Sequence, residues 1–374
     1  MTELTTDSLT TGSLAGIRVI DLSRVLGGPW CGQLLGDHGA DVIKVEPPQG
    51  DETRRWGPPF KQGVAAYYLG LNRNKRSGPF LDLSQQSGRE TLFELLADAD
   101  VLIENFKTGT MERWGIGYES LARRFPRLIH CRVSGFGSEG PLGGLVGYDA
   151  ALQAMSGIMS VNGDADGGGV RVGIPIVDQS AGMNAAIGIL LALFERTRSG
   201  LGQFIEASLY DTALSMLHPY STNWLTSQQP PQRSGNAHIS VYPYDVFPTG
   251  SVAVFIGAGN DRQFHTLCEC LQAPELAGDE RFATPAARSV NRQTLRTLLI
   301  AQLAGYDGAD FSERLLRAGV PSAPLLTVDA ALSHPHTLHR KMIIRIGDGY
   351  CGVASPIKLS RTPASYRLAP PKQP

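Results

Sequence analysis

The first half of the chain alternates short apolar runs with longer segments of helical pattern. The apolar runs, each of strand length, cover residues 17–21, 40–45, 101–104 and 128–133. The segments of helical pattern between them cover residues 28–39, 85–99 and 118–125. Strands that alternate with helices of this length predict a parallel sheet with right-handed crossovers.

Polar, glycine-rich or basic turns follow three of these predicted strands. They cover residues 23–28, 105–107 and 134–137. Ligands of open parallel sheets bind beyond the carboxyl ends of the strands. The turns therefore predict a site for a nucleotide-like ligand at one edge of the sheet.

The pattern changes near residue 226. A segment rich in Pro, Gln and Ser indicates a linker or lid over 227–236. Beyond it we expect a strand over 251–256 and helices over 292–303 and 310–318. At 374 residues the chain is also longer than one hydrophobic core usually serves, which favours more than one domain.

We therefore predict an α/β protein with three parts. Residues 1–225 form a large domain with a Rossmann-like parallel sheet, and residues 226–330 form a smaller α+β domain. Residues 331–374 form a return segment that packs on the large domain. Within it, we expect a strand over 357–360 and a frayed end over 369–374.

Composition excludes several classes of protein. Hydrophobic residues make up 42% of the chain and charged residues 18%, while the net charge is −1. This balance is typical of a soluble globular protein and creates no field that favours nucleic acid or an anionic membrane. The longest apolar run, residues 185–194, is too short to span a bilayer and indicates a buried helix.

Cysteine usage and the N-terminus predict a cytoplasmic protein. The five cysteines are scattered and contain no CxxC pair, which argues against a disulfide framework and against a structural zinc site. The polar, acidic start of the chain lacks the basic and apolar regions of a signal peptide.

The remaining short motifs are weak. Residues 135–140 match GxGxxG, but Pro141 follows instead of a helix, so a glycine-rich turn is favoured, one still able to present N–H groups to phosphate. Asp164-Ala-Asp-Gly lacks the later ligands of a calcium loop. His334, His336 and His339 have no other ligand type nearby, so we predict no metal site.

Asp178 is the most informative single residue. An apolar, extended stretch over 173–177 brings it to the start of an apolar helix over 182–196. Spacing alone favours an N-cap, because Asp is a preferred capping residue. A carboxylate at a helix N-terminus should also stay ionised at neutral pH, and an ionised carboxylate beside a Gly-rich loop can act as a nucleophile.

Segments spread over the chain resemble the family III CoA-transferases, which include formyl-CoA transferase and crotonobetainyl-CoA:carnitine CoA-transferase. The matching stretches are LAGIRVIDLSRVLGGPWCGQLLGDHGADVIKVEPP, NRNKRS, VLIENFKTGTMERWG, PRLIHCRVSGFGSEGP, GYDAALQAMSG, DQSAGMNAAIGILLALFERTRSGLGQ, YPYDVF and GAGNDRQF. They occur in the family's order and cover nearly the whole chain.

The resemblance implies a catalytic role for Asp178 and an interlocked, ring-like homodimer. It implies no permanently bound cofactor, since CoA enters as the acyl-CoA substrate together with a carboxylic acid. The family's glycine-rich loop over the active site falls on Gly257, Ala258 and Gly259. The family's CoA contacts fall on Val25, Leu26, Gly27, Asn105, Phe106, Lys107, Arg113, Ser134, Gly135, Phe136 and Gly137.

Departures from the family pattern bear on the substrate. Formyl-CoA transferases have Gln, a basic residue and Lys where this chain has Leu26, Pro47 and Ser134, which disfavours formyl or oxalyl substrates. The segments 53–60 and 257–264 resemble the branch that moves CoA between dicarboxylic acids such as succinate and glutarate. Arg54, Arg55 and Arg171 are candidates to hold a distal carboxylate, because guanidinium binds carboxylate with two bonds.

Three functions stay open at this point. A CoA-transferase leads, with Asp178 as a temporary acyl carrier. A 2-methylacyl-CoA racemase is second, but that branch has His-Asp where this chain has Tyr148-Asp149 and Glu where it has Asn260. Racemisation needs acid and base groups on both faces of the α-carbon, so these losses favour transfer. A catalytically silent CoA-binding protein is third.

Overall fold

The computed structural model describes residues 11–347 and 349–372 and divides the chain into two compact units. The first contains residues up to 158 together with 171–229 and 335 onward, and the second contains 159–170 and 230–334. The second unit thus includes residues 159–170, which we had placed in the large domain. The expectations for the first ten residues and for 373–374 lie outside the described residues.

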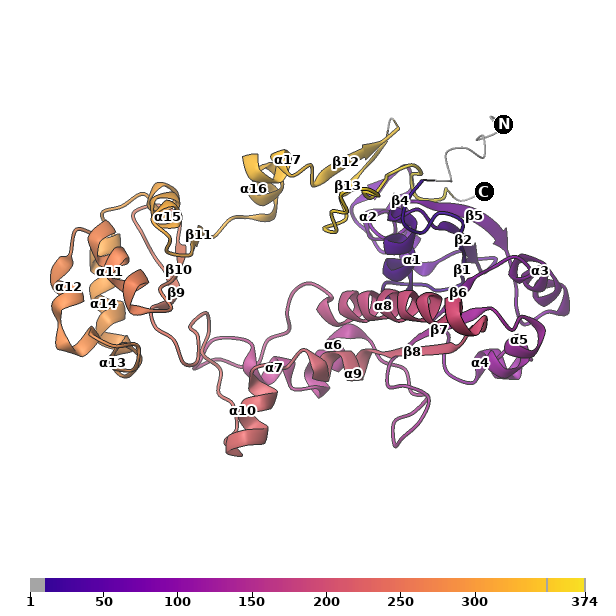
Figure 1. Cartoon of the computed structure of the whole chain (residues 1–374), viewed down its shortest axis with the longest axis horizontal. Coiled ribbons are helices and arrows are strands. Elements are labelled where there is room, and N and C mark those ends of the chain that lie inside the picture. The colour runs from indigo at the N-terminus through magenta and orange to yellow at the C-terminus, as the bar shows by residue number, and fades with distance from the viewer. Residues whose placement is uncertain (1–10, 348, 373–374) are drawn as a thin grey trace. The chain divides into compact units, whose positions relative to one another are not determined.

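A six-stranded parallel sheet organises the first unit, in the order β5-β2-β1-β6-β7-β8 (Figure 1). All five strand pairings are parallel, with Ile20 opposite both Ile43 and Leu102. The strands are β1 (Arg18–Asp21), β2 (Asp41–Glu46), β5 (Lys75–Phe80), β6 (Val101–Glu104), β7 (Ile129–Ser134) and β8 (Phe204–Ser208). The sequence patterning missed β5 and β8.

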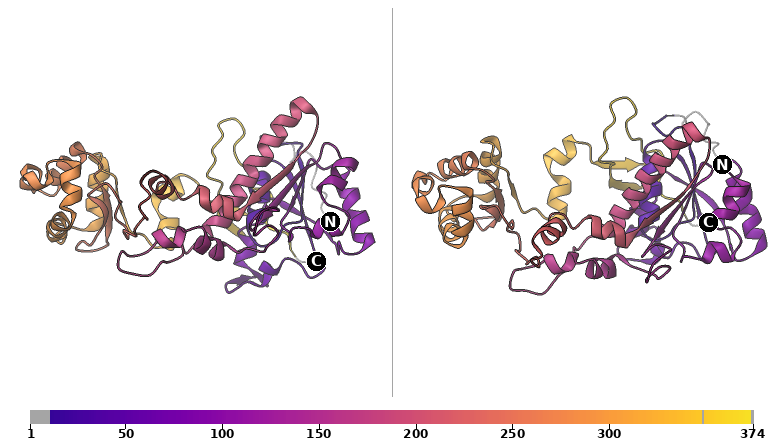
Figure 2. Two further views of the ribbon diagram at one scale, coloured as in Figure 1. Left: turned by 90° about the horizontal axis from the view of Figure 1, so that it is seen from below. Right: turned by 60° about the horizontal axis from the view of Figure 1, so that its bottom comes forward.

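Neighbouring residues of one strand enter different cores, as the period of a strand requires. Val19 of β1 belongs to a cluster with Cys31 and Ala185, which lie on helices α1 (Gly27–Asp37) and α8 (Ile176–Ser199). Its neighbour Ile20 belongs to a cluster with Leu92 on α3 (Gln86–Leu96). Figures 1 and 2 show the sheet between these two layers of helices.

Shorter elements complete the first unit. Its other helices are α2 (Ala66–Leu69), α4 (Thr110–Arg113), α5 (Tyr118–Arg124), α6 (Asp149–Met155), α7 (Ile158–Val161, whose last three residues belong to the second unit), α9 (Leu209–Ser215), α10 (Tyr220–Ser227) and α17 (Pro335–His339). A 3-10 helix, η2, covers Glu52–Arg55. Two small hairpins pair β3 (Phe60–Lys61) with β4 (Val64–Ala65) and β12 (Ile343–Ile346) with β13 (Tyr350–Val353).

The second unit packs helices around a three-stranded antiparallel sheet of order β11-β10-β9, in accord with an α+β architecture. Its strands are β9 (Tyr244–Phe247), β10 (Val254–Gly257) and β11 (Ser322–Pro324). Its helices are α11 (Asp261–Cys270), α12 (Pro274–Gly278), η3 (Glu280–Phe282), α13 (Pro285–Val290), α14 (Arg292–Leu303), α15 (Gly308–Arg317) and α16 (Val328–Ser333). A separate apolar cluster that includes Phe264 and Leu299 forms its core.

The C-terminal segment differs from both expectations made for it. Residues 357–360 form no strand. Residues 365–371 are held on the first unit, because Asn74 donates to the Ser365 and Leu368 carbonyls at 2.7 and 2.8 Å. Pro370 and Pro371 are buried, so residues 369–372 are bound rather than frayed.

Helix α8 is longer than its apolar run predicted. By length and composition alone it could cross a membrane, since an 18-residue window has a mean hydropathy of 1.5. Its buried residues, including Ala181 and Ile189, pack in the core above the parallel sheet. A core helix of this kind meets the same criteria as a membrane span, so the hydropathy does not indicate one.

Helices α1 and α8 approach each other through glycine. A Cβ added to Gly182 would lie 2.4 Å from the Gly27 carbonyl oxygen and 3.1 Å from the Trp30 ring. A Cβ added to Gly27 would lie 3.3 Å from the Asp178 carbonyl oxygen. Only residues without a side chain allow the two helices to lie this close.

Gly182→Ala should therefore destabilise the first unit by about 1–3 kcal/mol, because the new methyl group overpacks backbone that cannot rotate away. The matched control is Gly188→Ala on the same helix, where the added Cβ meets the Ile205 side chain at 2.9 Å rather than backbone. Urea unfolding of both variants measures the difference. Equal stabilities would contradict the importance of this contact.

Candidate active site

Asp178 lies in the first turn of α8 but does not cap the helix. The helix begins at Ile176, and Pro175 occupies the N-cap position. The carboxylate of Asp149 does the capping: its Oδ2 accepts from the backbone N–H groups of Val177 and Asp178 at 2.8 and 3.2 Å. Our N-cap prediction for Asp178 is thus wrong, and the side chain of Asp178 is released from a structural role.

The electrostatic environment of Asp178 also differs from the expectation. Burial, followed by the nearby Asp149 carboxylate, raises the pKa of Asp178 to about 7. Both effects disfavour the anion and outweigh the helix N-terminus, which should favour it. The carboxyl group therefore exchanges between its two protonation states near neutral pH. Our prediction that it stays ionised there is wrong.

The N-terminus of α1 faces the same carboxyl group. A Cβ on Gly27 would lie 3.7 Å from Asp178 Oδ1, so the backbone of α1 approaches the carboxyl group closely. The first N–H groups of a helix have no partner within it. Val25, just before the helix, adopts a φ of 68°, which a β-branched residue adopts only under constraint.

A cavity of about 300 Å³ contains Asp178 and most of the predicted CoA contacts. Its lining residues are Arg24, Val25, Leu26, Gly27, Glu52, Asn105, Phe106, Lys107, Thr108, Val133, Ser134, Gly135, Leu145, Val146, Gly147, Tyr148, Asp178 and Leu209. Most of them come from the turns that follow β1, β6 and β7, at the carboxyl ends of the strands, while Glu52, Asp178 and Leu209 come from η2, α8 and α9. We call it the inner cavity.

A second cavity of about 410 Å³ shares Arg24, Phe106 and Lys107 with the inner cavity. Its other lining residues are Leu22, Val45, Glu46, Pro47, Pro48, Gln49, Leu81, Asp82, Leu83, Thr110 and Trp114. We call it the outer cavity. Both cavities lie within the first unit.

Three predicted contacts lie beside the cavities rather than in their walls. Arg113 is exposed on α4 and donates to the hydroxyl oxygen of Thr110, a wall residue of the outer cavity, at 2.9 Å. The ring of Phe136 packs on Tyr210, with 5.7 Å between their centroids. Gly137 donates its N–H to Ser134 Oγ at 3.1 Å, which closes the turn after β7.

The predicted glycine loop follows β10 in the second unit. Gly257 and Ala258 donate backbone N–H groups to the carbonyls of Pro321 and Pro243, both at 2.8 Å. Gly259 donates to the side chain of Gln263 at 2.9 Å. Asn260 caps α11 by accepting from the N–H of Gln263 at 2.9 Å, so its side chain has a structural role.

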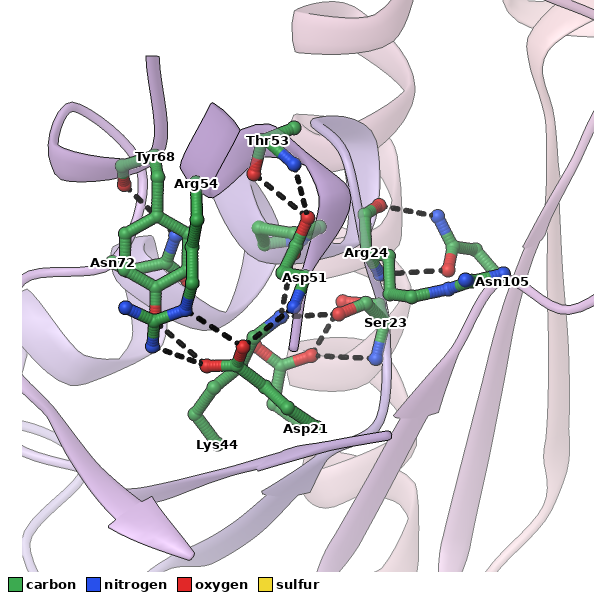
Figure 3. A network of polar contacts seen from close by, with 12 residues as sticks. Asp21, Ser23, Arg24, Lys44, Asp51, Thr53, Arg54, Tyr68, Asn72 and Asn105 are labelled. Carbon is green, nitrogen blue, oxygen red and sulfur yellow. Dashed lines mark hydrogen bonds and ion pairs between the residues drawn. The ribbon is translucent and has the colours of Figure 1, made fainter. Parts of the chain in front are cut away.

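The turns that line the inner cavity are tied together by backbone and side-chain bonds. The N–H of Arg24 donates to Asn105 Oδ1 at 2.8 Å, and Asn105 Nδ2 donates back to the Arg24 carbonyl at 2.6 Å. Figure 3 shows this pair beside a network of buried charges. The turn after β1 is therefore fixed to the turn after β6.

Two buried lysines also bind the turn after β1 and the start of α1. Lys75 donates to Asp21 Oδ2 and to the Pro29 carbonyl, both at 2.8 Å. Lys44 donates to the Ser23 carbonyl and lies 3.4 Å from Asp51 Oδ2 (Figure 3). Because these lysines bind backbone carbonyls, they fix both the turn after β1 and the start of α1.

The three arginine candidates for binding a distal carboxylate differ in burial. Arg54 is 2% exposed and donates to both oxygens of Glu46, at 2.9 and 2.6 Å. It is therefore not available to a substrate carboxylate, and our suggestion for this residue is wrong. Arg55 and Arg171 are exposed. They line neither cavity.

Sequence reasoning missed several residues of the cavity walls. Arg24 lies in the turn already identified after the first strand, so its position carried a signal. Sequence patterns carried no signal for four other wall residues, which lie outside the predicted turns: Glu52, Thr108, Tyr148 and Leu209. Within residues 11–347 and 349–372, no group of three or more His, Cys, Asp or Glu side chains could hold a metal ion.

Comparisons with known proteins identify the family of the chain. The sequence model of CoA-transferase family III matches residues 14–373. Succinate–glutarate CoA-transferase of Agrobacterium fabrum is 40% identical over 370 residues, which cover 96% of this chain and 92% of that protein. Acetyl-CoA:oxalate CoA-transferase of Acetobacter aceti is also 40% identical, with 96% and 92% covered.

A solved structure supports the fold. The crystal structure of a CAIB/BAIF family protein from Brucella suis is 41% identical, covers 97% of this chain and 96% of its own, and superposes with a TM-score of 0.88. Family, relatives and fold agree over nearly the whole length. The chain therefore belongs to CoA-transferase family III.

Proposed function

We propose that this protein moves CoA from an acyl-CoA thioester to a free dicarboxylic acid, with Asp178 as the covalent carrier. The observation that carries the proposal is the inner cavity, where the carboxyl group of Asp178 meets the turns that follow β1, β6 and β7. A carboxyl group freed from capping and placed at a ligand cavity is a candidate nucleophile.

The proposed reaction has two matched halves. The Asp178 carboxylate attacks the thioester carbonyl of the donor, a mixed anhydride forms, and CoA thiolate leaves with the electron pair of the C–S bond. The thiolate then attacks the aspartyl carbonyl, which forms an enzyme–CoA thioester and releases the donor acid. The acceptor carboxylate runs the same steps in reverse, so no proton is gained or lost overall.

Negative charge develops on carbonyl oxygens during these steps. The N-terminus of α1, whose backbone approaches Asp178 at Gly27, supplies N–H groups and a dipole of the sign that stabilises an oxyanion. Water must also be excluded, because it would hydrolyse the anhydride. We propose the Gly257–Gly259 loop as the shield, on the basis of the family resemblance.

The relatives indicate the acceptor class. Their names include the dicarboxylic acids succinate, glutarate, oxalate, mesaconate and D-citramalate, together with acetyl-CoA in the oxalate enzyme. Oxalate is among them, although the departures at Leu26 and Ser134 had disfavoured oxalyl substrates. A dicarboxylate acceptor is therefore proposed, with oxalate kept in the substrate panel.

Racemisation receives no support from the site. It needs a second acid or base beside the substrate α-carbon. Asp149, which contributes to raising the pKa of Asp178, is one candidate, but its Oδ2 caps α8 and its Oδ1 accepts from Gln153 Nε2 at 2.6 Å. Its two oxygens are thus committed to structure.

The proposed homodimer has support from α8. Five apolar side chains on this helix are exposed at helical spacing: Met183, Ile187, Leu190, Leu191 and Phe194. An apolar stripe of this kind on a protein surface marks an interaction site. A second copy of the chain is the occupant that the family resemblance implies.

Asp178→Asn should lower CoA transfer at least about a thousandfold, because the amide cannot form the anhydride. Intact-mass spectra of the parent protein, mixed with acyl-CoA donors and a panel of carboxylic acids, should show a CoA adduct that the variant lacks. The control is Asp166→Asn, since Asp166 is exposed and lies outside the cavities. Transfer at the parental rate by Asp178→Asn would sink the mechanism.

The activity should depend on pH through Asp178. Since only the anion attacks and the pKa is about 7, kcat/KM should rise roughly tenfold per pH unit below pH 7 and level off above it. The free energy of unfolding should change in the opposite direction. Folded Asp178 keeps its proton up to its pKa of about 7, whereas in the unfolded chain it loses the proton near the ordinary pKa of 3.8. Stability therefore falls as the pH rises from 3.8 to about 7.

Asp178→Asn removes that stability change, so the Tm difference between variant and parent should grow in favour of the variant from pH 5 to pH 8. Kinetics and thermal melts across this range measure both effects. A flat kcat/KM profile from pH 5 to pH 8 would show that the carboxyl group ionises well below neutral pH.

Leu191→Lys should disrupt the proposed homodimer, because it places a charge in the middle of the apolar stripe, at a residue 65% exposed in one chain. Light scattering should report a dimer for the parent and a lower mass for the variant, with circular dichroism to verify folding. Leu316→Lys, at an exposed position of α15, is the control. An unchanged mass for Leu191→Lys would remove the stripe from the interface.

A further inference from the structure

A buried glutamine bonds both segments that meet at the first turn of α8. Gln153, on α6, uses both ends of its side-chain amide. Its Nε2 donates to Asp149 Oδ1 at 2.6 Å, and its Oε1 accepts from the backbone N–H of Val172 at 2.8 Å. A longer bond of 3.4 Å goes from Nε2 to the Val172 carbonyl. The amide group therefore bridges the carboxylate that caps α8 and the backbone that leads into α8.

The backbone before α8 has little other support. The chain returns to the first unit at residue 171, five residues before the helix begins. Over the described residues, Gln153 is the one side chain from outside 171–175 that bonds the backbone of this segment. Arg171 donates only within it, to the Gly173 carbonyl at 3.3 Å. Gln153 therefore fixes the direction from which the chain enters α8.

The capping carboxylate depends on the same amide. Asp149 is buried, and over the described residues no cation forms an ion pair with it. Its Oδ2 accepts from the N–H groups of Val177 and Asp178, and its Oδ1 accepts from Gln153. A buried carboxylate needs such donors in place of water. The bond to Oδ1 also prevents the carboxyl group from rotating away from the N-terminus of α8.

We infer that Gln153 is a positioning residue for CoA transfer, because through Asp149 and Val172 it sets where the carboxyl group of Asp178 lies. The inference rests on the proposed function, in which that group attacks a thioester carbonyl and is then attacked by a thiolate. A misplacement of about 1 Å can cost on the order of a hundredfold in rate. Gln153 lines neither cavity, so it acts through its neighbours and not on the substrate.

Gln153→Met tests this role, because methionine keeps the length of the side chain and lacks the amide donor and acceptor. We expect kcat for CoA transfer to fall by about ten- to hundredfold while KM for the acyl-CoA stays unchanged, since the cavity walls keep their residues. Circular dichroism verifies folding. A parental kcat in the folded variant would overturn the inference, as would a raised KM with an unchanged kcat.

Gln153→Glu separates the hydrogen bonds from the packing. A protonated glutamic acid has the shape of glutamine and can donate to Asp149 and accept from Val172, whereas its ionised form repels Asp149. The ratio of kcat between variant and parent should be highest at pH 6 and fall as the pH rises to 9. Dividing by the parent at each pH removes the contribution of Asp178. A constant ratio would overturn the inference, even if Gln153→Met failed to fold.

The matched control is Gln86→Glu on α3, where an exposed glutamine donates to Glu90 Oε1 at 2.7 Å across the same spacing of four residues. Its ratio to the parent should stay constant over the same pH range. Absence of CoA transfer by the parent protein, or parental transfer by Asp178→Asn, would contradict the proposed function itself. If both of those tests succeed and the Gln153 variants behave as the parent does, only the positioning role is wrong.

Discussion

The close contact between the N-terminal turns of α1 and α8 is the constraint on which the site depends. Gly27 and Gly182 let the backbones of the two helices touch, and this places the first N–H groups of α1 beside Asp178. Beside this contact, Asp149 satisfies the first N–H groups of α8. One carboxylate performs the structural task and leaves the other for chemistry.

The site is rigid where it is made of backbone. Buried Lys44 and Lys75 bind carbonyls of the turn after β1 and of α1, and the Arg24–Asn105 pair joins that turn to its neighbour. A single buried charge costs several kcal/mol unless it is paired, so such lysines are retained where they meet both a carboxylate and a carbonyl. Here they preserve a turn in which Val25 has a positive φ.

Much of the first unit could be predicted from sequence. Strands such as 101–104 show as continuous apolar runs because both their faces are buried, and their turns located the cavity. Strand β5 was missed because its residues, KRSGPF, include charges and Pro. Lys75 is buried there with its charge paired to Asp21, a partner 54 residues away that no local pattern shows. The same limit explains the misassigned cap of Asp178, since its competitor Asp149 comes from a distant segment.

The contacts of segment 365–371 form late during synthesis of the chain. It holds Asn74, and its Pro371 carbonyl accepts from Arg54 Nη1 at 3.1 Å, so it touches the residues that position Glu46 at the outer cavity. These residues are translated after the whole second unit. During synthesis, the bond from Arg54 to Pro371 and the bonds from Asn74 to Ser365 and Leu368 can form only after the intervening second unit has been translated.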